Sequence, residues 1–302
     1  MAFAGCSCCT TWFSRDCPMV SVERMRPLLG TFVTIRAAPR LGLSQIQVEE
    51  AVESAFRAMV RVDRLMSFHR SMSDVSRINR SRRGTHVRVH SWTHAVLRAA
   101  AELSACTRGE FNCNVGGALM RNGLLPKVHG RPGGRSKPVH RTLDDALVLR
   151  RDRTVKLRAA MSLDLGGIAK GFAVDKAVHA LKARGVTCGA VNAGGDLRVF
   201  GIDPQPVWIR DPAAPAQARL MGELTEGAIA TSATYFTDRL KASGHGQSAI
   251  VDRKRRRVRV AGSVSVVART CMLADALTKV AVLRGRIPRD TARRANAFML
   301  AL

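Results

Sequence analysis

The first regular pattern of hydrophobic and polar positions in the chain lies just after Arg26. Over residues 31–36 the side chains alternate between two sides, with Thr31, Val33 and Ile35 together on one of them. Such alternation predicts a β-strand with two distinct faces. The folded part of the chain is therefore expected to begin close to this strand.

A long amphipathic helix is predicted next. Ser44 and Gln47 stand three residues apart, the spacing of a capping box, in which each side chain bonds the backbone N–H of the other residue. Apolar side chains then recur at spacings of three and four, at Val48, Val52, Ala55, Met59, Val62 and Met66. This spacing aligns them along one helical face, so we expect a helix that runs up to the sequence SFHR.

Three further helices are predicted, each followed by a glycine that can adopt the left-handed conformation at a helix end. They cover about residues 91–107, 168–184 and 272–284. Between the first two of them, residues 127–141 are rich in proline, glycine and basic side chains. That composition predicts a surface loop.

Short strands are predicted around these helices, because short apolar runs alternate with turn residues. They lie at about residues 146–151, 154–159, 190–192, 196–200, 207–210, 228–231, 249–252 and 264–268. Helices and strands follow one another irregularly, which favours an α+β fold over a doubly wound sheet. The loop at 127–141 is no domain boundary, because strand-like segments follow it at once.

The composition of the 302-residue chain is globular, but its charge is unusual. Hydrophobic residues make up 46%, while 49 Lys and Arg against 23 Asp and Glu give a net charge of +26. Such an excess suits nucleic acid or a phosphate-bearing ligand. Aromatic residues make up only 5%, with Tyr235 the single tyrosine, so stacking platforms for single strands are scarce. No nucleic-acid partner is expected, and the excess charge is interpreted as a lineage trait or a docking surface for an acidic partner.

Four of the eight cysteines, Cys6, Cys8, Cys9 and Cys17, lie in the first seventeen residues. No histidine or carboxylate supports a tetrahedral metal-ligand spacing there. The segment also lacks the basic region and the apolar stretch of a secretory signal. Residues 1–25 are therefore expected to form a disordered Cys-rich extension before a domain at 26–302, and the expected compartment is the cytoplasm.

The sequence DLGGIAKG, residues 164–171, carries the sharpest chemical signal. Asp164 precedes Gly166 and Gly167, and an amphipathic helix follows them. The glycines let a ligand approach the backbone, and the first helical turn offers free N–H groups and a partial positive charge to an anion. Lys170 would add a full positive charge. An ordinary glycine-capped helix start has the same pattern, so this motif alone leaves both interpretations open.

Two later segments add weaker signals. VNAGGDLRVFG, residues 191–201, predicts a strand, a tight turn and a second strand, without the helix that a dinucleotide-binding glycine motif requires. In CMLADALTKV, Asp275 and Thr278 lie one helical turn apart. Oxygen ligands at that spacing suit a hard cation such as Mg²⁺, although a solvated helix face explains a single carboxylate equally.

In their order and spacing these segments resemble the FAD:protein FMN transferases, the ApbE-like flavin transferases. The likeness runs from about Arg26 to Leu283, through GTFVTI, MSFHRSMSDVSRIN, GEFNCNVGG, DLGGIAKGFAVD, VNAGGDLRVFG, ATSATYF and SVSVVARTCMLADAL. It implies a single α+β flavin-transferase domain with FAD as substrate and Mg²⁺ as cofactor. Such an enzyme joins the FMN phosphate to a Thr or Ser hydroxyl of a target protein and releases AMP. Family acceptors are often membrane redox subunits, so the resemblance also allows a periplasmic or membrane-associated setting.

The resemblance assigns roles to individual residues. Asp164, Lys170 and Asp275 become the catalytic candidates, and Gly167, Asp275 and Thr278 the Mg²⁺ ligands. The residues expected along the FAD are Leu29, His69, Glu110, Phe111, Asn112, Asp164, Lys170 and Val251. These roles suit phosphoryl transfer, in which a metal ion and a lysine neutralise the charge on the transferring phosphate.

Three departures from the family pattern bear on activity. Asn112 stands in place of an aspartate, Ala249 in place of a histidine and Lys279 in place of a hydroxyl residue on the metal-binding helix. An ammonium has only donors and cannot coordinate a cation. Either Thr278 and water complete the metal shell, or Lys279 itself meets the phosphates. His245 is a candidate for the missing histidine.

Two other hypotheses stand beside an active flavin transferase. The first, which the departures motivate, is a degenerate relative that binds or hydrolyses FAD without flavinylating a protein. The second is a basic nucleic-acid-binding module that uses residues 252–260 and the loop after Lys127.

Overall fold

The structure, a computed structural model, describes residues 21–39, 42–126, 142–211, 214, 217–233, 249–253, 256, 258 and 262–301. The cysteine cluster before residue 20, the predicted loop at 127–141 and His245 lie outside these residues. No helix in the described part of the chain has both the length and the hydropathy to cross a membrane.

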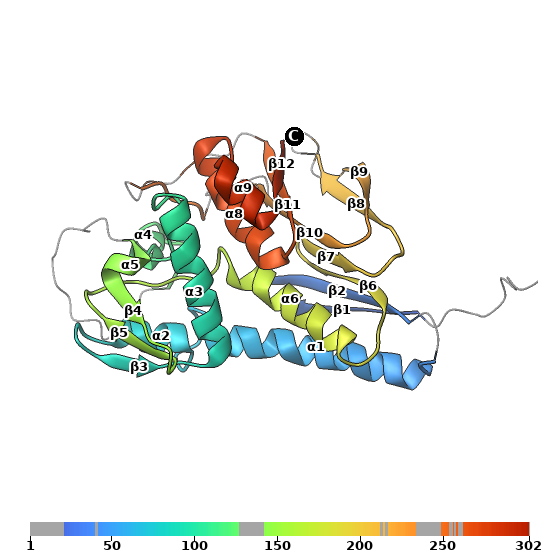
Figure 1. The fold of residues 1–302 in the computed structure, drawn as a ribbon, viewed down its shortest axis with the longest axis horizontal. Helices are drawn as coiled ribbons and strands as arrows, with labels where there is room; N and C mark the ends of the chain where they lie inside the picture. The colour runs from blue at the N-terminus through green and yellow to red at the C-terminus, as the bar shows by residue number, and fades with distance from the viewer. Residues whose placement is uncertain are drawn as a thin grey trace, which may run out of the picture.

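The main element is an antiparallel sheet of seven strands in the order β1-β2-β6-β7-β10-β11-β12 (Figure 1). Its strands are β1 (Val22–Leu28), β2 (Thr31–Ala38), β6 (Cys188–Ala193), β7 (Asp196–Phe200), β10 (Gly227–Ala233), β11 (Ser263–Ala268) and β12 (Phe298–Ala301). The alternation predicted for residues 31–36 is confirmed, because Val33 and Ile35 are fully buried while Phe32 is 66% exposed. Long helices of the domain pack against this sheet.

Three helices pack on one face of the sheet: α1 (Gln45–Met66) against β1 and β2, α6 (Ala169–Lys182) against β6 and β7, and α8 (Cys271–Arg284) against β10 and β11 (Figure 1). The capping box of α1 is confirmed, since the Gln47 N–H donates to Ser44 Oγ and the Ser44 N–H to Gln47 Oε1. All six apolar positions predicted for its buried face are buried.

A smaller layer lies at one end of α1 (Figure 1). It contains a three-stranded sheet in the order β3-β5-β4, built from β3 (His86–Arg88), β4 (Leu147–Leu149) and β5 (Thr154–Leu157). The helices α2 (Asp74–Arg80), α3 (Ser91–Cys106), α4 (Gly116–Arg121) and α5 (Leu143–Ala146) belong to this end of the molecule. A hydrophobic core runs without a break from this layer to the large sheet, which confirms an α+β fold built as one domain.

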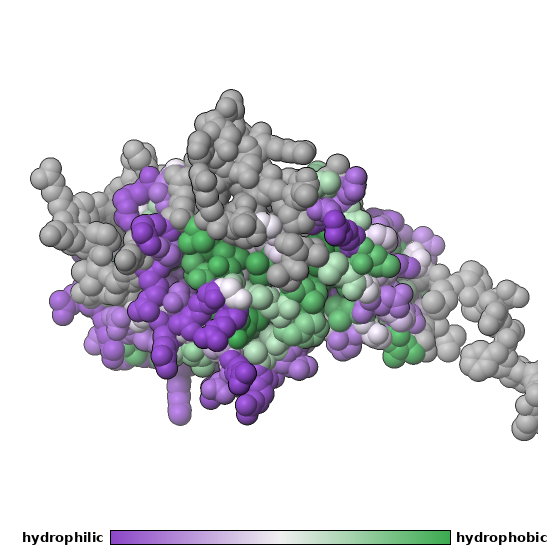
Figure 2. Space-filling view, turned by 90° about the horizontal axis from the view of Figure 1, so that it is seen from above, coloured by the Kyte–Doolittle hydropathy of each residue, from purple (hydrophilic) through white to green (hydrophobic). Residues whose placement is uncertain are grey.

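The remaining elements lie beside β11 and β12. The strands β8 (Gln205–Arg210) and β9 (Ala218–Leu224) form a separate hairpin, and α9 (Arg289–Ala295) follows α8. Seen from above Figure 1, hydrophobic residues gather in the middle of the molecular face, with hydrophilic residues on both sides (Figure 2).

Two of the sequence-based expectations about strands differ from the structure. The strand expected at residues 249–252 is reduced to an isolated bridge at Val251. The domain was expected to begin at residue 26, but the sheet starts at Val22. The edge strand β1 exposes most of its side chains, so its sequence shows no apolar alternation that would predict a strand.

Asp175 joins three elements of this fold. One carboxylate oxygen accepts from Arg198 Nη1 of β7 at 2.6 Å and from the Cys271 N–H at 2.9 Å, and the other accepts from the Met272 N–H at 2.9 Å. A carboxylate at the start of a helix is favourable because it bonds free N–H groups at the positive end of the helix dipole.

We expect Asp175→Asn to lower the free energy of unfolding by about 2 kcal/mol, because it weakens charge-assisted bonds at a partly buried helix end. Asp290→Asn is the control, since Asp290 lies in the first turn of α9 with its side chain 88% exposed. Chemical denaturation of both variants measures the difference. Equal stability of the two would contradict a capping role for Asp175.

Candidate active site

A cavity of about 460 Å³ opens where the two layers meet. Nine of the predicted site residues line it: Leu29, His69, Glu110, Phe111, Asn112, Asp164, Gly167, Lys170 and Val251. They come from segments far apart in the sequence, including the β1–β2 turn, the end of α1, the start of α6 and residues 249–251. Asp275 and Thr278, the other two predicted residues, do not line the cavity.

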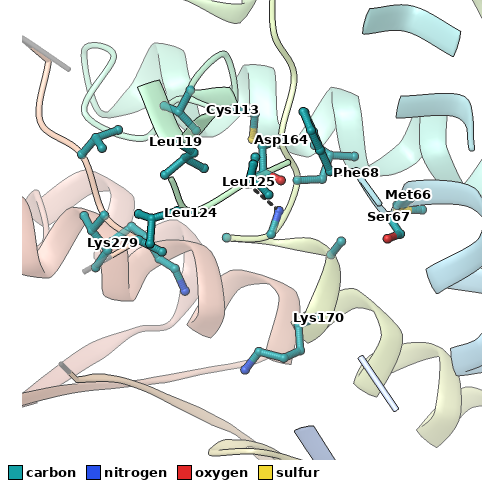
Figure 3. Close-up of a pocket in the computed structure, with 18 of the residues that line it drawn as sticks. Met66, Ser67, Phe68, Cys113, Leu119, Leu124, Leu125, Asp164, Lys170 and Lys279 are labelled. Atoms are coloured by element: carbon teal, nitrogen blue, oxygen red, sulfur yellow. Dashed lines mark hydrogen bonds between the residues drawn. The ribbon is translucent and has the colours of Figure 1, made fainter. Parts of the chain in front are cut away.

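Part of the cavity wall is apolar. Phe68, Leu119, Leu124 and Leu125 lie around it, close to Cys113 and Asp164 (Figure 3). Burial raises the pKa of the Cys113 thiol, so this cysteine stays neutral. Cavities of this size with apolar walls and a few polar groups are typical of small-molecule and cofactor sites.

The segment before α6 is held in place by two asparagine side chains. Asn79 donates from Nδ2 to the Leu163 carbonyl at 2.8 Å and accepts from the Leu163 N–H at 2.7 Å. Asn114 Oδ1 accepts from the Ser162 N–H at 2.9 Å. These bonds satisfy the buried backbone of a segment that belongs to no sheet. They fix the position of Asp164, the next residue.

Asp164 faces the cavity from the turn that starts α6. Its N–H donates to the Cys113 carbonyl at 2.8 Å, and its carboxylate accepts from the Gly166 N–H at 3.2 Å. Burial raises the pKa of Asp164, although the Gly166 N–H and the nearby His69 act in the opposite direction. Asp164 is therefore a carboxylate whose ionisation responds to what fills the cavity.

Lys170, in the first turn of α6, pairs with Asp196, a carboxylate outside the predicted site residues. Its Nζ lies 2.7 Å from Asp196 Oδ2 and 3.3 Å from the Ala193 carbonyl. The Asp196 side chain is 2% exposed. Burial opposes the charge on Lys170, but Asp196 and Asp275 raise its pKa above the ordinary value. Lys170 is thus held as a cation at the cavity wall.

The turn between β6 and β7 places Asp196 beneath Lys170. Gly194 and Gly195 form this predicted hairpin turn, both with positive φ, of 61° and 98°. A Cβ on Gly194 would lie 2.3 Å from Thr31 Oγ1, so only glycine fits there. Burial and the nearby Asp275 carboxylate raise the pKa of Asp196 to about 6, against the effect of Lys170.

Asp275 lies fully buried on α8, below the cavity wall. Its Oδ2 accepts from the Gly171 N–H of α6 at 3.1 Å, and its Oδ1 pairs with the ammonium of Lys279. Lys279 Nζ also donates to the Asp275 carbonyl at 3.0 Å. Burial alone would raise the pKa of Asp275, but Lys279 and Lys170 hold it below its ordinary value.

The donor set does not fit the Mg²⁺ site that the resemblance implies. Thr278 is 1% exposed, and its hydroxyl donates to the Asp275 carbonyl and bonds Ser232 Oγ. Asp275 forms an ion pair with the Lys279 ammonium, and an ammonium has no lone pair with which to bind a metal ion. Among the described residues, no three His, Cys, Asp or Glu side chains converge as they would around a metal ion. Gly167, Asp275 and Thr278 are therefore not arranged here as a set of cation ligands.

Three other predicted residues lie around the rim. Glu110 pairs with Arg284 of α8 at 3.5 Å, and Asn112 Oδ1 accepts from the Asn114 N–H at 2.8 Å. An aspartate would make the same turn, so the amide preserves the local structure without its charge. Leu29 has a φ of 57°, a conformation that costs a leucine energy and is often found at functional sites.

Sequence reasoning missed Asp196 and the cavity-lining leucines. The sequence places Asp196 in the predicted hairpin, and its distance in sequence from Lys170 gives no sign of the ion pair. Leu119, Leu124 and Leu125 lie in and after α4, a helix of six residues that was not predicted. Lys279 and Ala249, which were noted as departures, both line the cavity.

Comparison with known proteins places the chain in a family. A FAD:protein FMN transferase from Vibrio cholerae is 26% identical over 282 residues, which cover 89% of this chain and 83% of that protein. The structure of the flavin transferase ApbE from Vibrio cholerae matches with a TM-score of 0.76 at 24% identity, over 94% of both chains. The ApbE protein of Thermotoga maritima matches with a TM-score of 0.77 at 25% identity, over 93% of this chain and 94% of that one. The model of the ApbE family matches residues 29–297, and the chain therefore belongs to the ApbE family.

Proposed function

We propose that this protein transfers FMN from FAD to a Thr or Ser hydroxyl of a target protein and releases AMP. The observation that carries the proposal is the convergence, around one cavity, of nine residues that the family resemblance assigns to FAD or its metal. Membership of the ApbE family and the relatives named FAD:protein FMN transferase support the same activity.

The reaction is a phosphoryl transfer without oxidation or reduction. The acceptor hydroxyl oxygen forms a bond to the FMN phosphorus, and the bond from that phosphorus to the bridging pyrophosphate oxygen breaks. AMP leaves with the bridging oxygen, and the hydroxyl proton passes to solvent. Lys170 and Lys279 present positive charge to the pyrophosphate, which is the main contribution that a protein makes to this kind of reaction.

The remaining cavity residues suit the other parts of FAD. Phe111 and the four-residue group Phe68, Leu119, Leu124 and Leu125 offer apolar surface to a flavin or adenine ring. Leu29 and His69 lie where the resemblance expects contact with the flavin. Asp164, whose pKa burial raises, is the group proposed to take the acceptor proton and pass it to solvent.

Mg²⁺, expected from the resemblance at Gly167, Asp275 and Thr278, is not part of this proposal. Asp275 already pairs with Lys279, and the Thr278 hydroxyl bonds Ser232 and the helix backbone. The acceptor is expected to be a protein with an accessible threonine or serine, and a membrane redox subunit remains the class that the resemblance favours.

Ala249 supports a second candidate function. It lines the cavity at the position where the family pattern has a histidine, so this position supplies no imidazole to act as a base or a positioning group. A chain without that group could bind or hydrolyse FAD and leave the acceptor protein unlabelled.

Incubation with FAD and a candidate acceptor protein tests these proposals together. Flavin transfer predicts AMP by chromatography and an acceptor whose mass rises by that of FMN less one water. AMP with free FMN and no labelled acceptor would favour the hydrolytic alternative. Bound FAD without any AMP, for every acceptor and divalent cation tried, would contradict transfer.

A further inference from the structure

The most unusual feature of the site is a group of four charged side chains between α6, α8 and the β6–β7 turn. Asp196 and Asp275 form its buried side, with side chains 2% and 0% exposed. Lys170 and Lys279 pair with them and are 28% and 23% exposed. We call these residues the charge quartet. Its formal charges sum to zero, two negative groups below and two positive groups at the cavity wall.

Lys279 fills the space between two residues that were expected to hold a metal ion. Its ammonium bonds the carboxylate and the carbonyl of Asp275. Its stem packs on Gly167, since a Cβ added to that glycine would lie 3.4 Å from Lys279 Cε and 3.7 Å from Cγ. A cation bound by the Gly167 carbonyl and Asp275 would therefore meet a lysine side chain already in place.

Both lysines are among the residues that line the cavity. In Figure 3 the side chains of Lys170, on α6, and Lys279, on α8, lie below Asp164 in the view. A pyrophosphate that enters this part of the cavity meets two ammonium groups, because both carboxylates of the quartet lie behind them. Without Lys279, the quartet would present a net negative charge, which would require a bound cation before it could accept a phosphate.

We propose that Lys279 takes the place of the divalent cation, so that the charge quartet binds the pyrophosphate of FAD through Lys170 and Lys279 without a metal ion. The inference rests on the proposed function for the identity of the ligand. It extends that function by naming the groups that neutralise the phosphates.

The first test measures FAD binding to the wild-type protein by flavin fluorescence, once in excess chelator and once in millimolar Mg²⁺. The expected result is a Kd that changes by less than about 2-fold, since the lysines supply the charge. An FAD affinity that collapses in chelator and returns with Mg²⁺ would overturn the proposal.

The second test separates a phosphate-binding role of Lys279 from a purely structural one. Lys279→Met leaves Asp275 buried without its partner, so it is paired with the double variant Asp275→Asn/Lys279→Met. The asparagine carbonyl can still accept from the Gly171 N–H. Both variants are expected to bind FAD about 10- to 100-fold more weakly, because each loses a charged bond to the ligand. Riboflavin, which lacks phosphates, is expected to bind them as it binds the wild type.

If the folded double variant bound FAD as tightly as the wild type, the only role of Lys279 would be to neutralise Asp275, and the proposal would be overturned. Lys279→Arg, which keeps the charge, should retain most of the affinity, and Lys182→Met at the exposed end of α6 should retain all of it. Lys279→Thr should regain FAD affinity only when Mg²⁺ is added. These FAD affinities are measured without an acceptor protein, so they test the role of Lys279 alone. Failure to label an acceptor protein would contradict the proposed function without changing that result.

Discussion

Replacing Lys170 with methionine is expected to slow the release of AMP from FAD by about 100-fold or more, because removal of a preorganised charge at a transferring phosphate costs roughly 3 kcal/mol or more. Lys170 stands at the start of α6 with its Nζ 2.7 Å from Asp196 Oδ2. Methionine is close to lysine in length and removes the positive charge, but it also leaves Asp196 buried without its partner. The melting temperature of the variant is therefore measured together with its activity.

The loss should appear in the chemical step as well as in FAD binding. Single-turnover measurements of AMP, together with the Kd of FAD, separate the two effects. Lys176→Met is the matched control, because Lys176 lies on the same helix over Trp92 and Phe172, outside the cavity lining. A Lys170→Met protein that melts like the wild type and releases AMP within 3-fold of its rate would contradict a phosphate-neutralising role.

Replacing Gly171 with alanine is expected to destabilise the fold by about 3 kcal/mol, because the added methyl group would overpack the contact between α6 and α8. A Cβ at this position would lie 2.2 Å from the Cys271 carbonyl oxygen and 2.8 Å from the Met272 nitrogen. Both are backbone atoms, so the helices must move apart. Helix propensity alone predicts that the same substitution would stabilise the fold, since alanine is favoured over glycine in a helix by about 1 kcal/mol.

This movement should also disturb the site. The Gly171 N–H bonds Asp275 Oδ2, so any separation of the helices displaces Asp275 and Lys279 from Lys170. Gly117→Ala is the control, because Gly117 is also helical and its Cβ would meet other atoms only at 3.7 Å. Chemical denaturation measures both variants. A Gly171→Ala protein as stable as Gly117→Ala would contradict the close packing of α6 against the start of α8.

Much of the fold could be predicted from local sequence patterns. The buried face of α1 and its capping box follow from spacings of three and four residues, and the β6–β7 hairpin from Gly194 and Gly195. β1 could not be predicted in this way, because an edge strand with mostly exposed side chains lacks an apolar period. The short α4 was missed because six residues are too few to establish a helical period.

The candidate site could be predicted as a set of residues but not as an arrangement. The family resemblance selected nine residues that line the cavity. It also selected Thr278, whose hydroxyl is turned to Ser232 and to its own helix. Sequence spacing places Asp275 and Thr278 on one helical turn, yet it does not say which bonds their oxygens already make.

The sequence by itself determined the four longest helices, most strands and the α+β class, because these depend on residues near one another in the chain, and the order of its motifs indicated the family. Only the tertiary structure decided the electrostatics of the site. Lys170 meets Asp196 across 26 residues, and the Gly171 N–H meets Asp275 across 104. Charge interactions depend on distance and burial in three dimensions. The packing of α6 against α8 therefore decides that Lys279 sits between Gly167 and Asp275, where the family resemblance implies a metal ion.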